Sequence, residues 1–298
     1  DRISVEDLYK VDAVNSTTGN VRFNGVVQVV GNVEDGYVVE AGKGLAIGGT
    51  VGRTTVKAGG DITIGGGAMG ATIEASGSVA AKFFADCTVK AHQDVLAEEY
   101  ILHSTVEAGH AVHVTKPDIG FIKGGVTRAG QEIVSAVVGS EVSESDTRLE
   151  VGLGIDTRAR YDRLQPQMSN NMLTFDRGRK NVQYLQQKRE TEGTLSVPQT
   201  EQLQNAIVQA RKARDELFQS LEEHHTLLAG LAPTGGPGVV LVPALAHAAT
   251  VVQVQRFQTR VTNPLQACGF TIVDGVLKVL DAPQVAKLMR MRKRGSAA

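Results

Sequence analysis

The chain of 298 residues has few aromatic side chains, which make up 4% of it, and no tryptophan. A core built around large rings is therefore excluded, and small side chains must fill the interior. Only two cysteines occur, Cys87 and Cys268. Two distant cysteines cannot form a zinc site or a disulfide framework. A reducing compartment is the simplest interpretation, and we expect a cytoplasmic protein.

An excess of charge of one sign is also missing. The chain has 31 Lys and Arg residues against 32 Asp and Glu residues, which gives a formal net charge of −1. A protein that binds nucleic acid over its whole surface would be basic, so no nucleic-acid partner is expected.

Long hydrophobic runs are absent as well. The uncharged stretch 224–255 has an apolar part, Val239–Val252, that is too short for a spanning helix of about 20 residues and contains Pro243 and His247. The first residues are charged rather than apolar, so they do not form a signal peptide. Because the chain begins at Asp1 without Met, we expect an excised fragment of a longer protein.

Glycine, by contrast, is abundant, with 33 residues. The glycines punctuate a repeat of about seventeen residues that is marked by a recurring alanine. An apolar residue precedes each alanine by two positions, and further inward-facing positions follow four and six residues after it. The repeated alanines are Ala41, Ala58, Ala75, Ala91 and Ala108. Each unit thus contains two short stretches of period-two alternation separated by a turn, which is the pattern of β-strands.

A unit of this length, made only of strands and turns, predicts one coil of a three-sided parallel β-helix. Equivalent residues of successive coils stack about 4.8 Å apart, and a narrow corner accepts only a small side chain such as alanine. The third side is weakly marked, by Val33 and Val51. An earlier coil lies at 19–29 and a later one at 127–133, and the β-helix is predicted to span residues 1–154. The outward positions are polar: Glu40, Lys57, Glu74, Lys90 and Glu107.

The period changes in residues 155–232, which predict an antiparallel α-helical hairpin. The first helix is expected to start near Gln165, with Pro166 in its first turn, and the second after Ser196. Apolar residues follow a heptad frame in both helices, so a coiled coil and an ordinary helical bundle remain open. The first frame is Leu164, Met168, Asn171, Phe175, Gly178, Val182 and Leu185. The second is Leu203, Ile207, Ala210, Arg214, Leu217, Leu221, His224, Leu228 and Leu231.

After the hairpin, residues 233–281 read as returning strands that extend or cap the β-helix, with a hairpin turn at Asp274-Gly275. Residues 282–298 form a basic C-terminal tail. The segment 287–294 has five positive charges and no acid, so contact with an acidic membrane surface is possible. A solvated, frayed terminus is the simpler interpretation.

Partner-binding candidates come from two places. Leu217, Leu221 and Leu228 lie on the apolar stripe of the second helix, which the first helix covers only in part. We therefore expect residues 166–231 to act as a semi-independent arm that binds a partner or a second copy. The basic tail supplies the other candidates, which are Arg290, Arg292, Lys293 and Arg294.

No catalytic, cofactor or metal residue is expected. Gly65–Gly70 matches G-x-G-x-x-G, but a strand pattern follows it where a nucleotide site needs a helix. None of the histidines has ligand spacing. Asp61, Asp86, Asp94 and Asp118 are not in repeat register. A β-helix polysaccharide enzyme, which would need Asp61, Asp86, Asp94 and Glu98 to converge on a groove, and a self-polymerising β-helix scaffold are the alternatives.

Several segments taken together resemble the bacterial flagellar assembly protein A family. They are 19–25, the five V/I-x-A repeats, 60–64, 103–106, 122–125, 138–140 and 150–152. The resemblance implies a right-handed parallel β-helix, which agrees with the general crossover rule. It also implies a cytoplasmic, non-enzymatic role in flagellar assembly, with protein partners from the flagellar or polar machinery. It assigns no catalytic residue.

Overall fold

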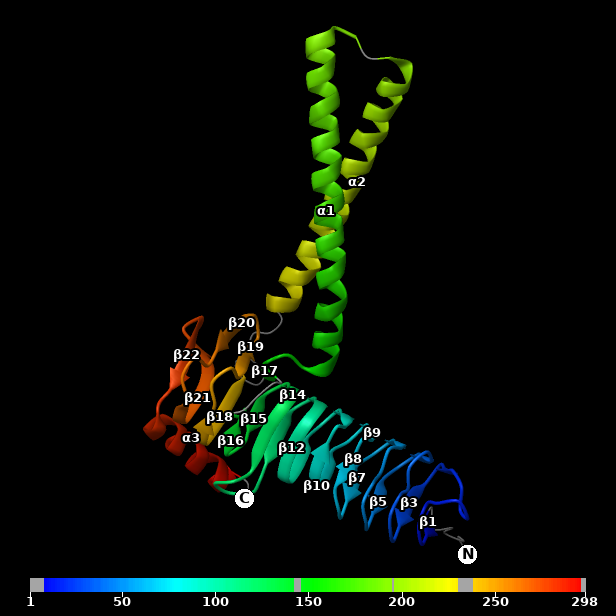
Figure 1. Cartoon of the computed structure of the whole chain (residues 1–298), viewed down its shortest axis with the longest axis vertical. Helices are drawn as coiled ribbons and strands as arrows, with labels where there is room; N and C mark the ends of the chain where they lie inside the picture. The colour runs from blue at the N-terminus through cyan, green and yellow to red at the C-terminus, as the bar shows by residue number, and fades with distance from the viewer. Residues whose placement is uncertain (1–7, 142–145, 195, 230–237, 296–298) are drawn as a thin grey trace, which may run out of the picture. The chain divides into compact units, whose positions relative to one another are not determined.

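The computed structural model describes residues 8–141, 146–194, 196–229 and 238–295, without the side chains of residues 156, 228, 229 and 293–295. The chain divides into two compact units. One comprises Asp1–Ile155 and Pro233–Ala298, and the other Asp156–Ala232. The first unit is a parallel β-solenoid of about eight turns, and the second is a helical hairpin that is inserted into the sequence between two solenoid strands (Figure 1).

The solenoid has three faces, here called A, B and C in the order in which each coil visits them. Face A contains the V/I-x-A strands, and in all of them the alternate residues point into the core. Its strands are β2 (Val21–Phe23), β4 (Val38–Ala41), β6 (Thr55–Ala58), β9 (Thr72–Ala75), β11 (Thr88–Ala91), the end of β12 (Val95–Ala108), the end of β14 (Phe121–Ala129), β17 (Thr147–Val151) and β19 (Val251–Val254). Successive strands pair in parallel.

Face B repeats this arrangement after a tight turn. Its strands are β1 (Leu8–Val11), β3 (Val26–Val29), β5 (Leu45–Ile47), β7 (Ile62–Ile64), the start of β10 (Val79–Ala85), the start of β12, β13 (Ala111–Val114), β15 (Glu132–Val134) and the start of β18 (Val239–Ala246). On face A, the predicted alanine column is confirmed, because its members are in register and buried. They are Ala41, Ala58, Ala75, Ala91 and Ala108.

Face C is the least regular of the three. In the first coils its neighbouring segments pair through isolated β-bridges instead of strands. Val14, Val33, Val51 and Ala68 bridge one another there, which confirms the third side marked by Val33 and Val51. Strands then lengthen this face: β8 (Ala68–Met69), the ends of β10 and β18, the middle of β12, the start of β14 and β16 (Val137–Val138).

An aromatic stack strengthens face C. The rings of Phe83 and Tyr100 stack at 4.9 Å, and those of Tyr100 and Phe121 at 5.1 Å, on three successive coils. Gly67 lies beneath the Phe83 ring, where any side chain would clash with it. The next residue, Phe84, points inward and is fully buried.

The returning strands first extend the solenoid and then close it. β18 continues faces B and C in parallel, and β19 continues face A. β20 (Phe257–Arg260), β21 (Leu265–Val273) and β22 (Val276–Leu280) then pair in antiparallel fashion, which ends the parallel stacking (Figure 1). The predicted turn at Asp274 and Gly275 is confirmed, with both residues at positive φ between β21 and β22.

The hairpin unit consists of α1 (Ile155–Glu192) and α2 (Val197–Ala229), which cross in Figure 1. The predicted start of the first helix is wrong: α1 begins at Ile155, and Pro166 lies inside it. Residues 155–164 lack an apolar period, but Arg158 and Asp162 form an ion pair at helical spacing that supports this turn.

The first heptad frame agrees with burial, since its seven residues are all buried or half-buried. Gly178 is the point of closest approach, because a Cβ there would lie 3.0 Å from Ala210 Cβ. In the second frame every other predicted position is one residue too late. Burial on α2 follows Leu203, Ala206, Ala210, Ala213 and Leu217, whereas Arg214 and Leu221 are exposed. The small residues Ala206 and Ala213 take the most buried of these positions, one residue before Ile207 and Arg214 of the predicted frame.

Candidate functional site

The α2 leucines do not form one surface. Leu217 is half-buried and continues the contact stripe of α2. Leu221 lies off that stripe and is 41% exposed, so it is available to a partner. The side chain of Leu228 lies outside the described part of the chain.

Phe218 is a further exposed residue that the heptad argument missed. It is 60% exposed and lies three residues before Leu221, on neighbouring positions of the same helix. An aromatic ring outside the apolar frame, in a chain with few aromatic residues, was the available signal. Phe218 and Leu221 together form a candidate apolar patch on α2.

The basic tail is not a frayed terminus in the described residues. Residues Ala282–Gly295 form helix α3, which belongs to the solenoid unit. Asp281 and Gln284 exchange backbone-to-side-chain hydrogen bonds of 3.0 and 3.1 Å, which form a capping box. Val285 is buried in a small cluster with Val134 and Leu241. Leu288 and Met289, at helical spacing from Val285, also pack against this cluster, so α3 is held on the solenoid unit and the expectation of a frayed terminus is wrong.

Arg292 faces the solenoid rather than solvent. Its guanidinium group contacts the carboxylate of Glu132 on β15 and donates to Nε2 of His113 on β13 at 2.9 Å. Nε2 of His113 also lies 3.0 Å from Glu132 Oε1. Arg292 therefore helps to hold α3 on face B, and it is not a free cation for a partner. The side chains of Lys293 and Arg294 lie outside the described part of the chain.

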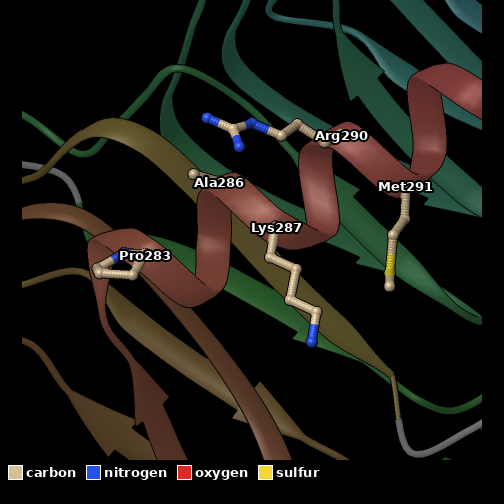
Figure 2. Close-up of a pocket in the computed structure, with 5 residues that line it drawn as sticks. All are labelled: Pro283, Ala286, Lys287, Arg290 and Met291. Atoms are coloured by element: carbon tan, nitrogen blue, oxygen red, sulfur yellow. The ribbon is translucent and has the colours of Figure 1, made fainter.

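Arg290 is exposed on α3. Together with Pro283, Ala286, Lys287 and Met291 it lines a hollow of about 480 Å³ (Figure 2). Two cationic heads beside apolar side chains suit an acidic, partly apolar surface. Of the predicted tail candidates, Arg290 is thus the one whose described side chain is exposed.

The surroundings of His113 predict that the stability of the solenoid unit depends on pH. The pKa of His113 lies below its usual value, first because the ring is buried and second because Arg292 is close, while Asp94 acts in the opposite direction. Folded His113 is therefore neutral where the unfolded chain, with an ordinary pKa of about 6.5, already takes up a proton. Stability is then lost as the pH falls below that value.

We expect acidification from about pH 7.5 to about pH 5.5 to lower the urea midpoint of the protein more than that of His113→Gln, which lacks the titrating ring. Urea unfolding at the two pH values, followed by circular dichroism, measures this difference. An equal loss in both proteins would show that His113 does not contribute.

The carboxylates of the enzyme alternative do not all lie at one corner. Asp61 and Asp94 precede equivalent face B strands, with Ser78 between them, so the view that they are out of register is wrong. Asp61 accepts from the Ser78 amide at 2.7 Å, and Asp94 from the Ala111 amide at 3.1 Å. These two carboxylates therefore tie successive turns together. Asp86 lies at another corner with positive φ.

The described residues contain no group of three or more His, Cys, Asp or Glu side chains that could hold a metal ion. Within the same residues, no helix has the length and apolar character needed to cross a membrane.

Comparison with known families identifies a match. The model of the flagellar assembly protein A β-solenoid domain matches residues 7–277. Searches of curated proteins and of solved structures found no significant match. The family match covers most of the chain, both solenoid segments and the inserted hairpin included. The chain therefore belongs to the flagellar assembly protein A family.

Proposed function

We propose that the protein is a non-enzymatic scaffold in bacterial flagellar assembly that acts in the cytoplasm through protein–protein contacts. The family match over residues 7–277 carries this proposal. The solenoid supports it, because repeat proteins present long regular faces to partners. The use of Asp61 and Asp94 in turns also favours a binding role over a catalytic one.

The hairpin is the part that we propose binds a protein of the flagellar or polar machinery, or a second copy of the chain. The exposed residues Phe218 and Leu221 support this proposal, because adjacent exposed apolar side chains on a helix suit burial against another chain. The exposed cations Lys287 and Arg290 of α3 support a secondary contact with an acidic membrane surface.

In a flagellated host, deletion of the gene is expected to abolish or strongly reduce swimming and filament number, and the wild-type gene should restore both. Leu221→Asp should fail to restore them and should weaken partner capture by about tenfold, which corresponds to about 1.4 kcal/mol. Val208→Asp is the matched control, since Val208 is also exposed on α2, ten residues from Phe218. Circular dichroism must show full helix content in both variants.

Normal swimming and filament number in the deletion strain would overturn the proposed function. Equal rescue by both variants would leave the flagellar role intact but would contradict the assignment of the α2 patch.

A further inference from the structure

One outward column of face A alternates strictly in charge. On successive strands the residues are Arg22, Glu40, Lys57, Glu74, Lys90, Glu107, Arg128 and Glu150, each directly opposite the next. We call this column the charge ladder, and each pair of neighbours in it a rung. The ladder ends at the neutral Gln253 on β19, where antiparallel pairing with β20 begins.

Four of the rungs are ion pairs in the structure. Arg22 lies 3.1 Å from Glu40, and Lys57 lies 3.0 Å from Glu74. Arg128 contacts the acids on both of its sides, Glu107 at 3.5 Å and Glu150 at 3.0 Å. Opposite charges directly across paired strands are favourable, and like charges there are unfavourable.

The other strand positions of faces A and B in these coils carry little information about which coil should lie beside which. The second outward column of face A is Thr55, Thr72, Thr88 and Thr105, and these residues are identical. The inward positions are the repeated alanines and a Val or Ile. The matching outward column of face B is uncharged, with Ala46, Thr63, Ala80 and Leu96. Apolar packing alone would therefore accept a coil that stacks on its second neighbour instead of its first.

The alternating charges of the ladder oppose the stacking of a coil on its second neighbour. If a coil were skipped, Glu40 would face Glu74, Lys57 would face Lys90, and Glu74 would face Glu107. Native stacking has opposite charges at the same positions. We propose that the charge ladder sets the order in which coils stack, by rejecting skipped-coil arrangements during folding. Charged groups that penalise a competing arrangement are a recognised route to specificity.

An exchange of two charges tests this directly. Glu74→Lys combined with Lys90→Glu keeps the composition and net charge of the chain. It creates like-charge rungs at positions 57/74 and 90/107. It also makes the skipped pairs 40/74, 57/90 and 74/107 attractive. The matched control is Lys82→Glu combined with Glu98→Lys, an exchange between two exposed residues of the same solenoid that are outside the ladder.

All three full-length proteins are unfolded in urea and refolded by dilution, and the monomer fraction is measured by size-exclusion chromatography. At about 0.01 M salt, where charges act over about 30 Å, we expect the ladder exchange to lower the monomer fraction at least about twofold relative to the wild type and the control. At about 1 M salt, where the range falls to about 3 Å, this difference should close.

An equal monomer fraction at low salt for the exchange variant and the wild type would overturn the proposal. A deficit that persists undiminished at high salt would also overturn it, because the defect would then lie in packing rather than in charge. The salt comparison remains decisive even if the exchange variant yields no monomer at low salt.

Discussion

Replacing Phe84 with alanine is expected to lower the free energy of unfolding of the solenoid by about 3–5 kcal/mol. The side chain is fully buried on face C, between Ala68 of one neighbouring coil and Ile101 of the other. Strands that are hydrogen-bonded on both sides cannot move together to fill the cavity left by the ring. Since single domains are stable by only about 5–15 kcal/mol, this is a large share of the total.

Phe83→Ala is the control, because it removes the same side chain from the adjacent residue. Its ring is half-exposed and stacks on Tyr100, so we expect a smaller loss, which includes about 0.5–1.5 kcal/mol for the stacked pair. Urea unfolding followed by the strand signal in circular dichroism compares the two variants. Equal losses would mean that face C tolerates a cavity in its interior.

Leu185→Asp is expected to unfold the hairpin while the solenoid stays folded. Leu185 is 4% exposed on α1, and a carboxylate there loses apolar contacts and is buried without a partner, at a cost of at least about 3 kcal/mol. Isolated helices are marginal in water and depend on such packing. The helical signal should therefore be lost at lower temperature, with the transition of the strands unchanged.

Tyr184→Asp is the neighbouring control, because Tyr184 is 62% exposed and its replacement should change little. Thermal scans at wavelengths for helix and for strand separate the two transitions. If Leu185→Asp removes the helical and strand signals together, the helices are core elements of one cooperative unit, and the proposed semi-independent arm is wrong.

The solenoid was predictable because the same sequence pattern recurs in each coil. The alanine spacing and the period-two alternation are local, and Ala41 through Ala108 stack as expected. Face C gave little signal, because Val14, Val33 and Val51 form single bridges with no alternation around them. The aromatic stack was missed because Phe83, Tyr100 and Phe121 are separated by unequal numbers of residues.

The helices and the tail were harder to predict for physical reasons. On α2, the heptad frame placed Ile207 and Arg214 in the contact, but the small residues Ala206 and Ala213, one position earlier, are the buried ones. For α3, the charge of Arg292 suggested solvent. Its contacts with His113 and Glu132 come from strands more than 150 residues earlier in the chain, and no local pattern reveals them.

The inserted hairpin delays the synthesis of the strands that close the solenoid. The end of β17 at Val151 is followed by about 90 residues before β18 begins at Val239. At roughly 5–20 residues per second, synthesis of this stretch takes about 5–18 s. Throughout that interval the newest strands of faces A and B have unpaired backbone edges, since β18 and β19 do not yet exist. The nascent chain is therefore most exposed to edge-to-edge aggregation at this stage, and chaperones would have most to protect before the cap emerges.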